Sequence, residues 1–314
     1  MTAATLPTLA VVGATATGKT AVGEALADAL DGEIVCADSR QVFAELEIGT
    51  GKPTPTERAA RPHHLFDALR LGEAASAGWY AGVSATTRTA IRARGRVPIL
   101  VGGSGLYLQA AREGLAELPP HDPAIRARLQ SEAGAEGAAA LHARLAEVDP
   151  ESAARLHPND RQRIVRALEV YTASGQPLSW WHARGRTGGD GEPWLVFELV
   201  VEPNRLNRRI RERSEAMFAG GLVDETRALL ADGRGDDLRA LRAIGYDEAI
   251  GVIEDRLSVP RACKVTSLRT RQLAKRQRTW FRHQVDALQL DGAADPLTLC
   301  ASIRAAIDRR ESTL

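Results

Sequence analysis

The sequence LAVVGATATGKT, at residues 9–20, decides the fold of this 314-residue chain. Its first four residues form an apolar run typical of a strand, and the run meets a glycine at once. After Lys19, apolar residues recur with helical spacing as far as Leu30. Between these two segments, Gly13–Thr20 fits the phosphate-loop pattern G-x-x-x-x-G-K-[ST]. The stretch therefore predicts a strand, an anion-binding loop and a helix.

The phosphate loop predicts a ligand with two or three linked phosphates, such as a nucleotide, and leaves the reaction open. Its glycines let backbone N–H groups point at an anion, and the helix N-terminus adds a partial positive charge. Lys19 would hold the outer phosphate oxygens, and the Thr20 hydroxyl would bind Mg²⁺. The candidate residues for this diphosphate site are Gly13, Ala14, Thr15, Ala16, Thr17, Gly18, Lys19 and Thr20.

Two further apolar runs end in residues suited to a ligand site. Ile34–Ala37 is followed by Asp38, and Val97–Val101 is followed by Gly102-Gly-Ser-Gly105. Strands that alternate with helices predict an α/β fold with a P-loop-type parallel sheet flanked by helices. Ligands bind at the edge formed by the carboxyl ends of such strands. There Asp38 could hold Mg²⁺ through water, accept a proton from a nucleophile or cap the next segment, and the sequence leaves these roles open.

A change of composition near Gly114 predicts a second domain. The following segments are rich in Ala, Arg, Glu and Leu with helical spacing and contain no convincing strand. Trp194–Val201 could rejoin the sheet, and the polar, glycine-rich stretch Gly185–Gly191 is typical of a flexible linker. We expect helices after Asn204. The predicted division is a catalytic core at residues 1–114 and 195–314 with a mainly helical insertion at residues 115–194.

The net charge of +1, from 41 basic and 40 acidic residues, conceals an uneven distribution. The segment Arg261–Arg282 holds eight basic residues and no acidic one, and the remainder of the chain carries a net charge of −7. One predicted helical face collects Arg271, Lys275, Arg278 and Arg282, the basic stripe. Such a face suits a phosphate backbone, although a solvated basic face is the alternative. A second basic patch comprises Arg155, Arg161, Arg163 and Arg166.

Other residues suggest smaller features. Arg209 and Arg213 are i, i+4 neighbours on a predicted helix and could reach one anion together. His63-His64 has no metal-ligand spacing, so we interpret the pair as structural. The widely separated Cys36, Cys263 and Cys300 suggest neither a disulfide framework nor a zinc module.

The chain start and the hydropathy suggest the compartment. The segment Met1–Val12 lacks the basic start of a secretory signal, and no stretch reaches the ~18 apolar residues of a spanning helix. We therefore expect a cytoplasmic monomer with no membrane partner.

Motifs along nearly the whole chain together resemble one enzyme family, the tRNA dimethylallyltransferases, also called tRNA isopentenyltransferases. Beside the phosphate loop, these motifs are Ala37-Asp-Ser-Arg-Gln41, Ile48-Gly-Thr-Gly-Lys-Pro53, Val101-Gly-Gly-Ser-Gly-Leu-Tyr107, His157-Pro-Asn-Asp-Arg-Gln-Arg163, Arg166-Ala-Leu-Glu-Val170, Ile244-Gly-Tyr246 and Thr270-Arg-Gln-Leu-Ala-Lys-Arg-Gln277. Their common order is far more specific than a phosphate loop alone. The absence of zinc-finger Cys/His pairs favours the bacterial type.

The resemblance implies that a dimethylallyl group moves from dimethylallyl diphosphate to N6 of adenosine 37, beside the anticodon of tRNA. The products would be N6-dimethylallyladenosine and diphosphate. By the same resemblance, Asp38 would be the general base, Thr20 would hold Mg²⁺, and Arg213 would clamp the phosphates. The implied contacts with the anticodon stem-loop are Asp38, Ser39, Arg40, Gln41, Ser104, Arg126, Gln162, Arg163, Ile164, Val165 and Arg166, and the insertion would close on the stem.

The chain departs from the family pattern at Phe43, where many members carry Tyr. Three other functions remain open from sequence. A P-loop kinase would use the phosphate loop but leave the basic stripe and the insertion without a role. An isopentenyltransferase acting on free adenine nucleotides would also leave both unused. A non-catalytic RNA-binding protein would use the stripe and leave the phosphate loop unused.

Overall fold

The computed structural model describes residues 6–189 and 191–311 and divides into two compact units. The core unit takes in the residues up to Arg112 and those after Gly189, and the helical unit spans Glu113–Gly189. The sequence boundaries at residues 114/115 and 194/195 fall within a few residues of this division. Residues 1–5 and 312–314 of the predicted core, and Asp190 of the predicted linker, lie outside the described residues.

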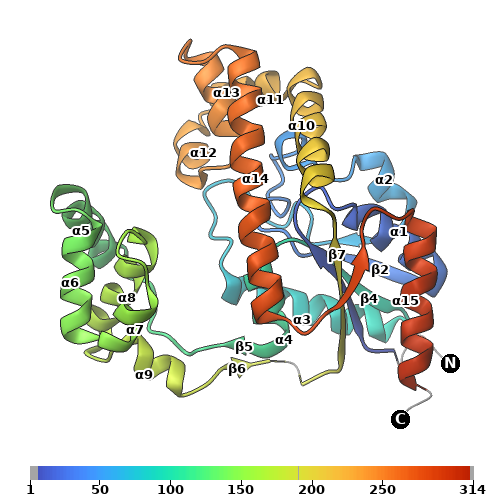
Figure 1. Cartoon of the computed structure of the whole chain (residues 1–314), viewed down its shortest axis with the longest axis horizontal. Helices are drawn as coiled ribbons and strands as arrows, with labels where there is room; N and C mark the ends of the chain where they lie inside the picture. Colours follow the sequence, from blue (N-terminus) through green and yellow to red (C-terminus); the bar gives the residue numbers. More distant parts are fainter. Residues whose placement is uncertain (1–5, 190, 312–314) are drawn as a thin grey trace. The chain divides into compact units, whose positions relative to one another are not determined.

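The core unit is built on a six-stranded sheet in the order β3-β2-β4-β1-β7-β8 (Figure 1). The strands are β1 Thr8–Gly13, β2 Gly32–Cys36, β3 His63–His64, β4 Val97–Gly102, β7 Trp194–Val200 and β8 Leu288–Asp291. Each neighbouring pair is parallel, so all carboxyl ends lie at one edge. The predicted P-loop-type parallel sheet is confirmed, and Trp194–Val200 rejoins it beside β1.

Helices cover both faces of the sheet because successive side chains of each strand point to opposite faces. On β1, Leu9 and Val11 belong to one core cluster, whereas Ala10 and Val12 belong to the other. The helices around this sheet are α1 Lys19–Leu30, α2 Pro55–Ala60, α3 Ala77–Ala93, α4 Gly105–Glu113 and α15 Pro296–Glu311, with a 3-10 turn at Ile48–Thr50.

Five more helices of the core unit follow β7. They are α10 Pro203–Ala219, α11 Leu222–Ala231, α12 Gly235–Leu241, α13 Tyr246–Ile253 and α14 Val259–Gln284. Helix α14 packs against α10, and its Ala274 is buried with Ala14 of the phosphate loop and Ile210 of α10. The sequence prediction missed β8, because this edge strand is only four residues long and mostly exposed. Its formation depends on pairing with β7.

The helical unit contains α5 Pro123–Ala135, α6 Ala138–Val148, α7 Pro150–Arg155, α8 Arg161–Ser174 and α9 Leu178–Ala183. Leu129, Leu145 and Ile164 form the centre of its own apolar core. Two short strands, β5 Gly114–Leu115 and β6 Thr187–Gly188, pair antiparallel at its ends. Within the predicted linker Gly185–Gly191, Thr187–Gly188 thus pairs with β5, and the flexibility of the stretch stays a prediction.

No helix within residues 6–189 and 191–311 has both the length and the apolar character needed to span a membrane.

The end of β4 approaches the end of β2 so closely that only glycine fits. A Cβ on Gly102 would lie 2.0 Å from the carbonyl oxygen of Ala37, the residue before Asp38. That carbonyl also accepts a hydrogen bond from the Ser104 N–H at 3.1 Å. Backbone cannot yield here as a flexible side chain could, so Gly102 keeps these two loops together.

We expect Gly102→Ala to reduce the free energy of unfolding by about 2–3 kcal/mol, because the added methyl group overpacks against backbone. Urea denaturation measures this change. The matched control is Gly82→Ala in the exposed interior of α3, where an added Cβ meets nothing within 4 Å. That change should instead stabilise by about 0.5–1 kcal/mol. Equal effects of the two variants would contradict the close approach at Gly102.

Candidate active site

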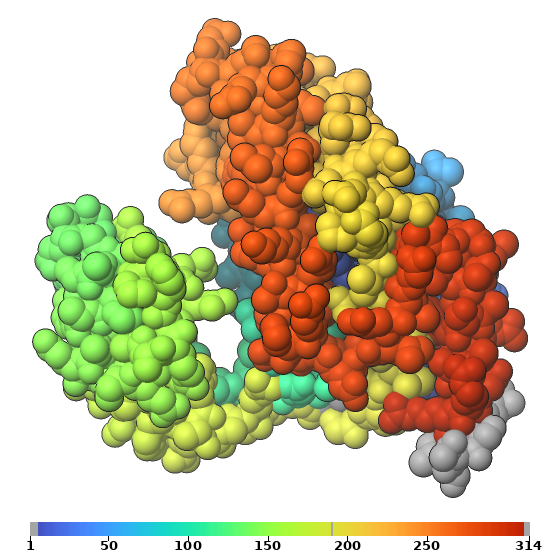
Figure 2. Space-filling view, in the orientation of Figure 1, coloured from blue at the N-terminus to red at the C-terminus, as the bar shows by residue number. Residues whose placement is uncertain are grey.

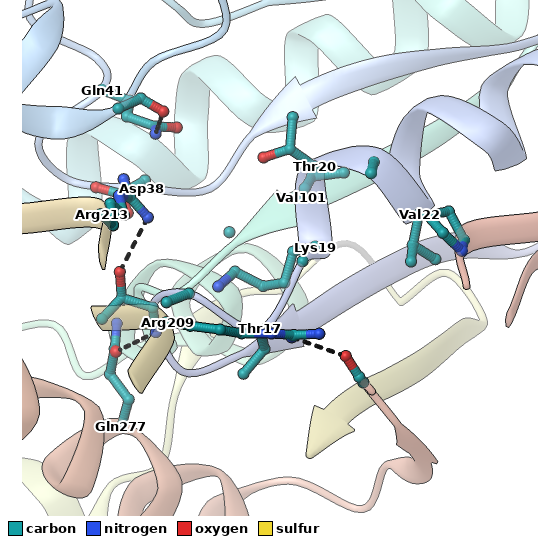
Figure 3. Close-up of a pocket in the computed structure, with 18 of the residues that line it drawn as sticks. Thr17, Lys19, Thr20, Val22, Asp38, Gln41, Val101, Arg209, Arg213 and Gln277 are labelled. Atoms are coloured by element: carbon teal, nitrogen blue, oxygen red, sulfur yellow. Dashed lines mark hydrogen bonds between the residues drawn. The ribbon is translucent and has the colours of Figure 1, made fainter. Parts of the chain in front are cut away.

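The phosphate loop connects β1 to α1 and lines a cavity of about 400 Å³ (Figure 3). Gly18 has a φ of 94°, a left-handed conformation that suits glycine, and α1 begins at the next residue. The Thr17 hydroxyl donates to the Ala14 carbonyl at 2.9 Å, which closes the loop internally. The loop is therefore shaped as an anion cradle at the carboxyl edge of the sheet.

Lys19 supplies a positive charge, and its buried surroundings disfavour the charged form. Its ammonium group donates to the Ala14 carbonyl at 2.6 Å. Desolvation lowers the pKa of Lys19 to about 8; the Asp38 carboxylate opposes this shift and the Arg213 guanidinium adds to it. In Figure 3 the side chain extends toward the side of the cavity that carries Asp38 and Arg213. The negative charge of a bound anion would raise this pKa again.

Two arginines of α10 face the same cavity, as their i, i+4 spacing suggested. Arg209 donates to the Gly292 carbonyl at 2.9 Å, just after β8. Arg213 donates to the Thr15 hydroxyl at 3.3 Å and to the Thr50 carbonyl at 2.8 Å. Burial lowers the pKa of Arg213, and the nearby Asp38 carboxylate opposes that shift. Together with Lys19, these arginines make the cavity strongly cationic.

Asp38 follows β2 and stands between two cavities. One carboxylate oxygen accepts the Arg40 N–H at 2.9 Å, so the capping role that the sequence left open is present. Asp38 lines the phosphate-loop cavity and also a second cavity of about 680 Å³. The residues shared by both cavities are Thr15, Asp38, Thr50, Arg213 and Gln277. Capping therefore coexists with a position where a carboxylate can act on two ligands.

The second cavity gathers several of the predicted RNA-contacting residues of the core unit. Ser39, Arg40 and Ser104 line it, and the Ser39 N–H donates to the Ser104 hydroxyl at 2.9 Å. Gln41 lies instead in the phosphate-loop cavity, where its amide donates to the carbonyls of Thr50 and Gly51 at 3.2 and 3.1 Å. Gln41 thus orders a loop rather than lining the second cavity.

The loop that orients Arg213 is held by residues whose role the sequence did not reveal. Glu225 accepts the Ile48 N–H at 2.8 Å, and the Tyr246 hydroxyl both donates to Glu225 and accepts the Gly49 N–H. Burial raises the pKa of Tyr246, and the Glu225 carboxylate adds to this rise, so the phenol stays a donor. The motifs at Ile48–Pro53 and Ile244–Tyr246 therefore contact each other and together hold the loop that orients Arg213. Only their contact in space reveals it.

The predicted RNA contacts of the helical unit divide by exposure. Gln162 and Arg163 are exposed on α8. Ile164 and Val165 are 0% and 2% exposed in the core of that unit, so their side chains face away from solvent. Helical periodicity turns these two residues inward while their neighbours face solvent.

Arg126 and Arg166 of the helical unit share one acidic partner. Arg166 lies 3.1 Å from a Glu169 carboxylate oxygen, and Arg126 lies 3.9 Å from the other. The Glu169 side chain is fully buried. Both arginines therefore have a structural partner as well as partial exposure.

The basic stripe lies on α14, one side of which is uncovered in Figure 2. Arg271, Lys275 and Arg282 are exposed, whereas Arg278 is half-buried. The opposite side of the helix packs through Ala274 and the fully buried Phe281. The helix thus has the packed and cationic faces that its sequence predicted.

Phe43 and the histidine pair serve packing and hydrogen bonding. Phe43, where many family members carry Tyr, is 2% exposed in a core cluster. His64 lies 2.5 Å from a Glu33 carboxylate oxygen, and His63 contacts the Arg61 carbonyl at 2.8 Å.

The donor atoms near the phosphate loop fit Mg²⁺. Thr20 and Asp38 offer oxygen atoms in the same cavity, and Mg²⁺ prefers one or two protein oxygens together with substrate phosphates and waters. Among the residues that the structure describes, no group of three or more His, Cys, Asp or Glu residues could hold a metal by itself. This donor set therefore suits a metal that arrives with a diphosphate.

The fold and the site define a P-loop protein of the α/β class, with a cationic cavity of about 400 Å³ beside a second, larger one. The chain belongs to the IPP transferase family, whose model matches residues 41–284. The isopentenyl transferase model matches residues 7–67.

Individual relatives agree with this assignment. The chain is 44% identical to a tRNA dimethylallyltransferase of Desulfovibrio desulfuricans, over 91% of this chain and 88% of that protein. It is 45% identical to one of Halorhodospira halophila, over 91% and 93%. The crystal structure of a tRNA isopentenylpyrophosphate transferase from Bacillus halodurans matches with a TM-score of 0.69 and 31% identity, over 98% of each chain.

We expect the protein to take up protons when inorganic diphosphate binds with Mg²⁺ above pH 8. At pH 8.5 most Lys19 side chains are neutral, and a bound anion raises the pKa, so up to about 0.8 proton enters per site. Calorimetry in buffers of different ionisation enthalpy measures this uptake.

Lys19→Arg is the matched control, since a guanidinium stays charged throughout this range. Protonation changes of the diphosphate itself occur equally in both proteins and cancel in the difference. Equal uptake by the two proteins would show that Lys19 does not titrate in the site.

Proposed function

We propose that this chain transfers a dimethylallyl group from dimethylallyl diphosphate to N6 of adenosine 37 in tRNA, releasing diphosphate. One observation carries the proposal: Asp38 and Arg213 stand on the wall shared by the phosphate-loop cavity and the second cavity. A group that moves from a diphosphate in one cavity to a base in the other must pass the residues that line both cavities. The names of the relatives, tRNA dimethylallyltransferases, support the same reaction.

The diphosphate would occupy the phosphate-loop cavity. As the bond between the dimethylallyl C1 and the diphosphate oxygen breaks, negative charge grows on that oxygen. Lys19, Arg209, Arg213 and the loop N–H groups are fixed around the cavity, so they stabilise this charge without reorganising. When bound through the Thr20 hydroxyl, and through water to Asp38, Mg²⁺ would neutralise further charge on the leaving group.

The adenine would enter the second cavity after leaving its stack in the anticodon loop. Extruding a base costs a few kcal/mol, which contacts in the cavity must offset. The exocyclic amine of adenine is a poor nucleophile. As N6 bonds to C1, one N6 proton would pass to Asp38, whose free carboxylate oxygen remains available beside the cap to Arg40. Ser39, Arg40 and Ser104 would surround the base.

The basic stripe and the helical unit would bind the rest of the anticodon stem-loop. Exposed cations on α14 suit a phosphate backbone, because each neutralised phosphate releases counterions. In the helical unit, the exposed Gln162 and Arg163 are the strongest remaining candidates, followed by Arg126 and Arg166. We also propose that the protein acts as a monomer in the cytoplasm, where tRNA is found.

We expect Asp38→Asn to lower transfer at least about 100-fold, because an amide cannot accept the N6 proton. The assay mixes the protein with Mg²⁺, dimethylallyl diphosphate and unmodified tRNA and analyses nucleosides by mass. Binding of tRNA should stay within about twofold.

The matched control is Asp232→Asn at the exposed end of α11, which should transfer at the wild-type rate. Wild-type rates in Asp38→Asn would refute the assigned base. Absence of the modified nucleoside with the wild-type protein would refute the proposed function itself.

We expect the pair Arg271→Gln and Lys275→Gln to weaken tRNA binding and to reduce its salt dependence. Removing two phosphate contacts should lower the slope of log K against log salt by about 1.5. Filter binding at several salt concentrations measures the slope. Arg304→Gln with Arg310→Gln on α15 removes the same charge from exposed positions outside the proposed contact. An identical loss in both double variants would mean that net charge, rather than α14, determines binding.

A further inference from the structure

Gln277 of α14 joins the two glycine-containing loops at the edge of the sheet. Its side-chain oxygen accepts the Thr15 N–H at 2.9 Å, and its side-chain nitrogen donates to the Gly103 carbonyl at 2.9 Å. Only one orientation of the amide satisfies a donor on one loop and an acceptor on the other. Gln277 is therefore held in a defined position between β1 and β4.

The glycine turn after β4 is shaped to admit this helix. A Cβ on Gly103 would lie 2.5 Å from the Gln277 side-chain nitrogen. A Cβ on Gly105 would lie 2.1 Å from the Trp280 ring, one turn further along α14. The sequence suggested that this turn offers backbone groups to a ligand. In the structure, the turn lines both cavities, and its missing side chains also make room for α14.

Hydrogen bonds connect Gln277 through Thr15 to Arg213. Thr15 donates its N–H to Gln277, and its hydroxyl accepts from Arg213 at 3.3 Å (dashed lines at Gln277 and Arg213 in Figure 3). Thr15, Arg213 and Gln277 all line both cavities. Because the Thr15 N–H is bound to Gln277, its orientation within the phosphate loop depends on α14.

We propose that Gln277 is a positioning residue that fixes Thr15, and through it Arg213, in the conformation that binds diphosphate. The inference deepens the proposed function and rests on it, since it makes the helix with the basic stripe a structural part of the diphosphate site. Other contacts, such as those of Ala274 and Phe281, hold α14 in place without Gln277.

The test replaces Gln277 by Met, which keeps the length of the side chain and removes both hydrogen bonds. Calorimetry with inorganic diphosphate and Mg²⁺ should show about tenfold weaker binding, and the KM for dimethylallyl diphosphate should rise by a similar factor. Binding of tRNA should change less than about twofold, and the melting temperature should change little. Gln284→Met, at the exposed end of α14, is the matched control and should behave as the wild type.

Unchanged diphosphate binding in Gln277→Met would overturn the proposal. So would a parallel loss of diphosphate binding, tRNA binding and thermal stability, because that pattern describes a purely structural residue. If Gln277→Met fails to fold, Gln277→Asn decides by the same measurements, since the shorter amide cannot span both loops. Diphosphate binding is measured without RNA, so a failure of prenyl transfer in the wild type would count against the proposed function alone.

Discussion

Parallel pairing of the three central strands, β2, β4 and β1, sets the geometry of the site. Val101 of β4 is level with Val11 of β1 on one side and with Cys36 of β2 on the other. The three strands therefore end within two residues of this level, at Gly13, Gly102 and Cys36. This register brings the phosphate loop, Asp38 and the glycine turn to one edge. The missing side chain of Gly102 allows the last two to touch.

The site gathers positive charge, which lowers the stability of the folded protein when no ligand is bound. The lowered pKa of Lys19 means that its charged form is disfavoured until an anion arrives. Between pH 8 and the ordinary lysine range, the unfolded chain binds this proton more readily than the folded one, so the group's contribution to stability rises with pH. A polyanionic ligand reverses the imbalance. The positive charge of the site therefore favours the protein with a bound anion over the protein without one.

Helix α14 has two chemically different faces. Its inner face carries Ala274 against the phosphate loop and Gln277 between the loops, while its outer face carries exposed cations. Arg213 is also held indirectly. Glu225 and Tyr246 accept hydrogen bonds from the backbone of residues 47–49 rather than contacting a ligand, and the next residue, Thr50, accepts one from Arg213. Much of what orders the site thus lies outside the phosphate loop itself.

The sequence alone determined the features that depend on local order. A strand, glycine loop and helix follow from residues 9–30, and the stripe on α14 follows from helical spacing, because neighbours in the chain dictate both. It could not show that Leu288–Asp291 pairs with β7 or that Gln277 spans two loops. These depend on contacts between residues far apart in the chain. Tertiary structure determines them, because the local sequence pattern does not show which distant residue will be the partner in a hydrogen bond or a packed face.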